Sequence, residues 1–217
     1  MPTDNPVIAN IRRSLAAARQ SSHAVPAPAA RPPIPPGRAA GEPAAEIERL
    51  LAEINALAGS ARRLPEAEIP AALQALVAEQ QIHKACLWQT AEIEALGIAA
   101  HLTALGVEIV APTAGKHALA ECDLGVTGVD YALPATGTLA LLSSPEKPRA
   151  VSLLPRVHLA LLHPAALRAD LADVFAETKH AAYTIFITGP SRTSDIELTL
   201  TLGVHGPKAL YAWLLED

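Results

Sequence analysis

From residue 84 onward, short apolar runs alternate with amphipathic stretches. Several runs are rich in β-branched residues and end at Gly, Pro or polar clusters, which is typical of buried strands. The runs predict strands at residues 84–88, 107–110, 124–127, 138–142, 157–162, 183–188 and 209–215. Continuous apolar strands separated by helices favour an α/β fold with a mostly parallel sheet covered by helices on both faces.

Apolar residues at helical spacing predict the covering helices. These lie at residues 44–58, 67–81, 90–104, 114–121, 164–179 and 194–202. Ser194 and Glu197 match the S-x-x-E capping box, so the last helix should begin at Ser194. The helix at 164–179 should bury one apolar side, formed by Leu167, Leu171, Val174 and Phe175.

The first 43 residues differ from the rest. Residues 5–20 predict a helix with Ile8, Ile11 and Leu15 on one stripe. Residues 21–43 contain seven prolines, which lack an amide donor and disfavour helix. We therefore expect a helical arm at 1–20, a Pro/Ala-rich linker at 21–43 and an α/β domain at 44–217. The arm is either a frayed terminus or a docking element.

Composition and charge argue against nucleic acid as the main partner. Half of the residues are hydrophobic, yet only 3% are aromatic, and the net charge is −5. Residues 1–45 hold five basic and two acidic side chains, whereas the remainder hold twelve and twenty. Phosphate binding needs clustered Lys and Arg, which an acidic domain does not supply.

Cys86 and Cys122 are the two cysteines of the chain. Two thiols form no disulfide framework and cannot supply four thiolates to an iron–sulfur cluster or a structural zinc. The histidines show no H-x-H or H-x-x-x-H spacing, so we expect no metal and no resident cofactor. No signal peptide and no apolar segment of membrane-spanning length is visible. We therefore expect a cytoplasmic protein without a membrane span.

The strongest local signal for chemistry is TGPSRTSDIE, at residues 188–197. It follows a predicted strand and precedes a predicted helix, where open α/β sheets bind ligands and helix amides favour an anion. The guanidinium of Arg192 can donate two parallel hydrogen bonds to a carboxylate or phosphate. We predict a site for phosphate, carboxylate or pyrophosphate, formed by Gly189, Pro190, Ser191, Arg192, Thr193 and Asp195. The alternative is a well-capped turn with a surface arginine.

Three further segments place polar residues beside predicted strands. PATGT offers two hydroxyls around a glycine, LPRVH places an arginine and a histidine on one strand face, and GVHGPK forms a turn. For each, a structural role is the alternative: turn chemistry, a buried core histidine or a solvated side chain. The ligand-binding candidates from these segments are Thr136, Gly137, Thr138, Arg156, His158 and His205.

These segments together carry a family resemblance. DLGVTGVDYALPATGTLALL, LLPRVHLALL and FITGPSRTSDIELTLTLGVHGPKALYAWLLE resemble the lactate-utilisation protein C family, also called the LUD-domain family. The resemblance is dense over residues 120–217, with a weaker echo in IRRSLAAA. It implies a fold shared with sugar-phosphate isomerases and coenzyme A transferases. It also implies a cytoplasmic role in oxidising L-lactate to pyruvate with two iron–sulfur partner proteins.

One departure from the family pattern bears on chemistry. Relatives often have Glu directly before TGT, whereas this chain has Ala135. A carboxylate there could act as a nucleophile or base. Its absence weakens transferase-type chemistry and leaves binding, through Thr136, Gly137, Thr138 and Arg192, as the expectation.

Three hypotheses for the function follow, in this order. The first is a cluster-free component of a lactate-oxidising system that binds a small anion or a partner's cofactor. The second is a scaffold or regulatory module whose arm docks an acidic partner or a second copy, giving a homo-oligomer. The third, resting on fold analogy alone, is a stand-alone enzyme acting on a phosphorylated or acyl-coenzyme A substrate. Whether the chain catalyses any step stays open at this point.

Overall fold

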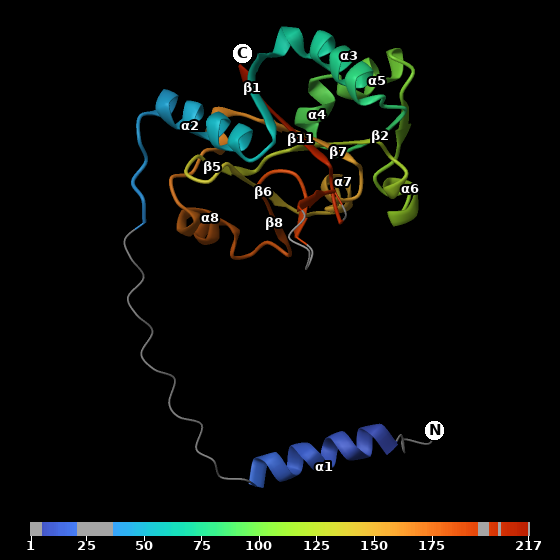
Figure 1. Cartoon of the computed structure of the whole chain (residues 1–217), viewed down its shortest axis with the longest axis vertical. Helices are drawn as coiled ribbons and strands as arrows, with labels where there is room; N and C mark the ends of the chain where they lie inside the picture. The colour runs from blue at the N-terminus through green and yellow to red at the C-terminus, as the bar shows by residue number, and fades with distance from the viewer. Residues whose placement is uncertain (1–5, 21–36, 195–199, 204, 217) are drawn as a thin grey trace. The chain divides into compact units, whose positions relative to one another are not determined.

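The computed structural model describes residues 6–20, 37–194, 200–203 and 205–216 (Figure 1). The chain divides into one unit at Met1–Pro36 and a second at Gly37–Asp217. The first unit contains helix α1 (Pro6–Gln20), at the position where the arm is expected. The second unit is the α/β body, and its first helix is α2 (Pro43–Ala56).

The body is built around a six-stranded sheet in which every neighbouring pair is parallel. The strand order is β1-β11-β7-β4-β2-β3. The strands are β1 (Ser60–Pro65), β2 (Lys84–Leu87), β3 (Glu108–Val110), β4 (Leu124–Gly128), β7 (Val157–Leu162) and β11 (Ala209–Glu216). Every residue of β4 and β7 is buried, which explains why their sequences are apolar without alternation.

Helices and a second, smaller sheet cover the two faces. The 3-10 and α-helices are η1 (Glu66–Glu68), α3 (Ile69–Gln80), α4 (Ala91–Ala95), α5 (Ile98–Ala104), α6 (Lys116–Ala120), α7 (Ala150–Leu153), η2 (Pro164–Ala166) and α8 (Leu171–Thr178). The small sheet is antiparallel, with order β5-β6-β8, and consists of β5 (Tyr131–Leu133), β6 (Thr138–Leu142) and β8 (Thr184–Ile187).

These elements form layers. Figure 1 shows α3, α4 and α5 on one side of the six-stranded sheet and the small sheet with α8 on the other. Leu139 and Leu141 of β6 belong to the same buried cluster as residues of the six-stranded sheet. The expected parallel-rich sheet covered on both faces is therefore confirmed, and an antiparallel sheet supplies part of the cover.

Helix α7 lies directly against the central strand β4. A Cβ on Gly125 would fall 1.9 Å from the carbonyl oxygen of Val151, so only glycine permits this approach. The contact holds α7 over the face of the sheet that also bears the residues discussed below.

The helix predicted over 194–202 is wrong at both ends. Strands β9 (Arg192–Ser194) and β10 (Leu200–Leu202) form an antiparallel pair there, and residues 195–199 lie outside the described residues. Leu and Thr alternate over residues 198–202, and this period of two favours strand. Pairing between the two arms outweighs the capping-box pattern at Ser194.

Three more predictions need correction, and three further elements escaped prediction. The single helix over 90–104 is instead α4 and α5, divided at Gly97, whose φ is +61°. The single helix over 164–179 is instead η2 followed by α8, which Asp170 caps through the Ala172 amide at 2.8 Å. Leu171 and Phe175 are 42% and 54% exposed rather than buried. β1, β5 and α7 were not predicted, because β1 alternates in burial and contains two arginines while the other two are very short.

The Gly125 contact gives a stability prediction. Gly125→Ala should lower the free energy of unfolding by roughly 1–3 kcal/mol, because α7 must move away from β4. Gly128→Ala in the same strand is the control, since its Cβ would meet Glu92 at an ordinary 3.5 Å. Urea unfolding of both variants tests this, and equal destabilisation would contradict the packing account.

Candidate functional site

His158 is the buried polar residue around which the candidate site is built. It is the second residue of β7, in register with Gly125 of β4 and Leu210 of β11. Its side chain is 1% exposed, and its Nε2 lies 2.8 Å from the hydroxyl oxygen of Thr127, which is fully buried. Gly125, Thr127 and His158 therefore share one face of the sheet.

A hollow of about 280 Å³ opens over this face, and we call it the His158 hollow. Its base is His158 and Leu210, near the amino ends of β7 and β11. Its walls come from α7, from β8 with the following loop, and from the turn before β11. The predicted candidates that line it are His158, Gly189, Pro190, Ser191 and His205.

The imidazole of His158 is neutral at physiological pH. Burial lowers its pKa to about 3, because a buried imidazolium would lose its hydration. Among the described residues its Nδ1 has no hydrogen-bond partner. An unpartnered buried polar atom costs about 1–3 kcal/mol, so a ligand atom placed against Nδ1 would be stabilised.

Backbone hydrogen bonds and close backbone packing fix the position of the loop after β8. Gly189 has a φ of +85°, and a Cβ there would lie 2.8 Å from the carbonyl oxygen of Leu57. The amide of Ser191 donates to the carbonyl of Pro207 at 2.9 Å, and the amide of Gly203 donates to the carbonyl of Ser191 at 2.9 Å. Because β9 rather than a helix directly follows the loop, the loop does not lie at the amino terminus of any helix that the structure describes.

Arg192 and Thr193 begin the strand pair. The guanidinium of Arg192 donates to the carbonyl of Leu57, which occupies one of its N–H groups, and Arg192 does not line the His158 hollow. Thr193 has its backbone in β9. Asp195 lies outside the described residues. Anion binding by these three residues stays a prediction.

The PATGT segment meets the loop through a chain of hydroxyl groups. Thr136 and Thr138 are 2.8 Å apart at their hydroxyl oxygens, and Thr138 is 2.9 Å from Thr188. Gly137 has a φ of +61° and packs against the backbone of α2. Thr188 lines both the His158 hollow and a neighbouring hollow of about 440 Å³, which Ala135, Thr136 and Thr138 also line.

Arg156 lies away from these candidates. Its Nε donates to the Asp123 carboxylate at 3.0 Å, and its guanidinium also donates to the carbonyls of Gln80 and Gln81. Burial alone would raise the pKa of Asp123, but amide hydrogen bonds from His83 and Lys84, together with Arg156, lower it. These contacts join α3 to β7 and indicate a structural role.

The structure offers few ligands for a metal. Among the residues it describes, no group of three or more His, Cys, Asp or Glu side chains could hold a metal ion. Cys86 and Cys122 are buried, and burial raises the pKa of the Cys86 thiol. No helix in the described ranges is long and apolar enough to cross a membrane.

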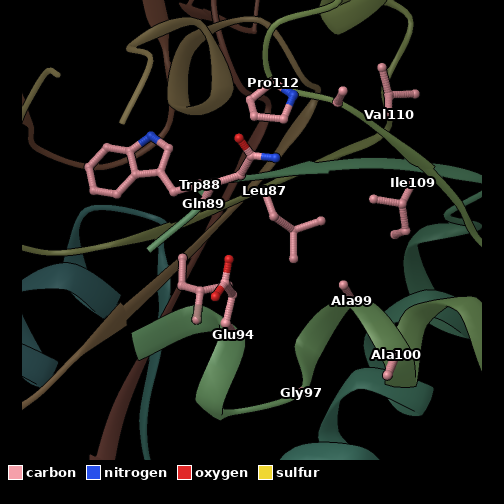
Figure 2. Close-up of a pocket in the computed structure, with 12 residues that line it drawn as sticks. Leu87, Trp88, Gln89, Glu94, Gly97, Ala99, Ala100, Ile109, Val110 and Pro112 are labelled. Atoms are coloured by element: carbon pink, nitrogen blue, oxygen red, sulfur yellow. The ribbon is translucent and has the colours of Figure 1, made fainter. Parts of the chain in front are cut away.

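A further hollow, of about 460 Å³, was not predicted from the sequence. It lies at the carboxyl ends of the strands, whereas the His158 hollow lies at their amino ends. This further hollow lies beyond the carboxyl ends of β2 and β3 and is lined largely by apolar side chains (Figure 2). Its residues follow two predicted strands, but that β2 lies between β3 and β4 emerges only from the folded sheet.

Comparison with known proteins places this geometry in context. Residues 47–215 match the model of the LUD domain. Lactate utilization protein C of Halalkalibacterium halodurans is 31% identical over 157 residues, covering 67% of this chain and 68% of the relative. The protein of that name from Bacillus subtilis is 34% identical over 100 residues, covering 42% of each chain.

Two other similar proteins have names that state no activity. The uncharacterized protein NMB1437 of Neisseria meningitidis is 39% identical over 93 residues, covering 41% of this chain and 40% of the relative. The crystal structure of a DUF162 family protein from Deinococcus radiodurans superposes with a TM-score of 0.60 at 18% identity. It covers 82% of this chain and 100% of that one, which shows a shared fold.

The neutral state of His158 gives a prediction on pH. An unfolded histidine has a pKa near 6.5, so the unfolded chain takes up this proton first as the pH falls. Above pH 6.5, His158 is neutral in both the folded and the unfolded chain and should make the free energy of unfolding neither rise nor fall with pH. This free energy should fall between pH 6.5 and 3 by up to roughly 1.4 kcal/mol per pH unit.

Urea unfolding at pH 7 and pH 4.5 measures this effect. His158→Gln should show a smaller loss of stability on acidification than the unchanged chain, whereas the exposed His117→Gln should match the unchanged chain. If His158→Gln loses as much stability as the unchanged chain, the histidine is not held neutral by folding.

Proposed function

The chain belongs to the LUD-domain family, and on this basis we propose that it is a component of a lactate-utilisation system that binds a small hydroxy- or keto-acid in the His158 hollow. In this role the iron–sulfur chemistry belongs to partner proteins, since two cysteines cannot hold a cluster here. The aligned relatives named lactate utilization protein C support the pathway.

The observation that carries the proposal is the unpartnered Nδ1 of a buried, neutral histidine in a hollow. We propose that Nε2 accepts the hydroxyl hydrogen of Thr127, 2.8 Å away, which places the ring proton on Nδ1, where it donates to a ligand oxygen. The hydroxyl of Ser191 and the ring of exposed His205 line the same hollow and can donate as well. Lactate and pyruvate carry acceptor oxygens on adjacent carbons, so one molecule can accept hydrogen bonds from several of these donors.

The binding prediction uses the purified full chain. Isothermal titration should detect pyruvate or L-lactate, and Ser191→Ala should weaken binding roughly threefold to tenfold through one lost hydrogen bond. Thr113→Ala, an exposed position away from the hollow, should bind as the unchanged chain does. Absence of heat with both acids, or equal affinities for both variants, would contradict the proposal.

A specific observation also favours docking through the arm. Helix α1 exposes Ile8, Ile11 and Leu15 by 44%, 53% and 57%, and its sequence includes three arginines but no acidic residue. An apolar stripe flanked by arginines fits a hydrophobic groove with an acidic rim on a partner protein. The iron–sulfur proteins of the proposed system are the partners that we infer for it.

The arm gives a prediction that is independent of the hollow. Ile11→Asp should reduce co-purification with the iron–sulfur partner proteins at least about tenfold, because it places a charge on the apolar stripe. Asn10→Asp on the same helix is the control, since it adds the same charge beside the stripe. Pull-down of both variants decides the matter, and equal capture would remove the docking role.

A further inference from the structure

Strand β8 has one side without a partner strand in the part of the chain that the structure describes. It is the last strand of the small sheet, in the order β5-β6-β8, and it pairs with β6 alone. In Figure 1 it is the lowest of the three labelled strands of this sheet. An edge strand presents a row of N–H and C=O groups that can pair with a strand of another chain.

The register between β6 and β8 determines which backbone groups face this free edge. The amide of Ser143, directly after β6, donates to the carbonyl of Tyr183, directly before β8, at 3.0 Å. In an antiparallel pair of strands, hydrogen-bonded and non-hydrogen-bonded residue pairs alternate. Thr184 and Phe186 are therefore non-hydrogen-bonded on the β6 side, and their N–H and C=O groups point to the free edge.

The free edge of β8 also lacks the charges that keep edge strands apart. The outer strands of the large sheet carry such charges, with Arg62 and Arg63 in β1 and Glu108 in β3. β8 reads TIFI, and its Phe186 is 38% exposed. The ring of Phe175, which is 54% exposed, lies 5.7 Å from the Phe186 ring. An uncharged edge beside exposed aromatic rings favours pairing with another strand.

We propose that β8 pairs antiparallel with β8 of a second copy of this chain, about a two-fold axis at Phe186. Because both backbone groups of Phe186 face the free edge, this residue and its counterpart exchange a pair of hydrogen bonds across the axis. The small sheet then continues from one copy into the other. The two Phe186 rings lie on the same face of this sheet, where they add to the aromatic contacts with Phe175.

The composition of β8 favours a second copy over a charged peptide. In a two-fold pairing, each residue faces a residue of the same strand, so a charge near the axis would meet a like charge. β8 has no charged residue and avoids this repulsion. A charged peptide would find no opposite charge on the strand. This inference does not depend on the function proposed for the His158 hollow.

Sedimentation velocity of the full chain tests the proposal. The unchanged chain should dimerise with a dissociation constant below about 100 µM. Phe186→Lys should raise this constant at least about tenfold, because two ammonium groups meet across the axis. Ile109→Lys is the matched control, since Ile109 is also 38% exposed and lies in the edge strand β3. It should dimerise as the unchanged chain does.

The reverse charge tests the register. Phe186→Glu alone should dimerise as weakly as Phe186→Lys, whereas an equimolar mixture of the two should form a mixed dimer, because opposite charges then face each other. In the unchanged chain, deuterium exchange of the Phe186 amide should slow as the protein concentration rises. This measurement does not depend on how the variants fold.

Three results would overturn the proposal. The first is an unchanged chain that stays monomeric at about 100 µM, which would leave the edge for a strand of another protein. The second is an Ile109→Lys variant that loses the dimer as fully as Phe186→Lys. The third is a Phe186 amide whose exchange does not change with concentration, together with a mixture of the Lys and Glu variants that stays monomeric.

Discussion

The hydrogen bond between His158 and Thr127 is the interaction on which the His158 hollow depends. It joins two central strands across a face that is otherwise apolar, and it leaves Nδ1 of the ring without a partner among the described residues. The same face admits α7 only because Gly125 lacks a Cβ. Glycine, threonine and histidine on adjacent strands thus determine both the wall and the base of the hollow. A charged ring would be far more costly to bury, which is why the neutral form prevails.

Two edges of one parallel sheet carry different chemistry. At the amino ends of β7 and β11, a neutral imidazole and hydroxyl groups surround a small hollow. At the carboxyl ends of β2 and β3, apolar walls and one carboxylate surround a larger one. The fold rule for α/β sheets points to the carboxyl ends of the strands, whereas five of the twelve sequence-predicted residues line the hollow at the amino ends. Strand β8, which carries the predicted loop, belongs to the antiparallel sheet, so that rule did not apply to it.

The sequence predicts buried strands well because their burial leaves a direct mark on composition. The runs at 138–142 and 157–162 coincide with β6 and β7. Prediction from the sequence fails where strand pairing determines the secondary structure. Ser194 carries a helix-capping signal but pairs with Leu200 in a strand. The site shows the same division. Ser191 and His205 meet at one hollow as residues of two predicted motifs, whereas Arg156, chosen for its place beside His158, bonds to Asp123 because it precedes β7. Strand order and the Gly125 contact arise from tertiary packing and have no local signal.

Nitrogen-15 NMR of the histidine rings, recorded with and without pyruvate, tests the central claim most directly. The account predicts that His158 stays neutral from pH 7 to pH 4.5, with its proton on Nδ1, and that this nitrogen shifts when pyruvate is added. A ring that takes up a proton near pH 6.5, or an Nδ1 signal that pyruvate leaves unchanged while the acid binds, would contradict it.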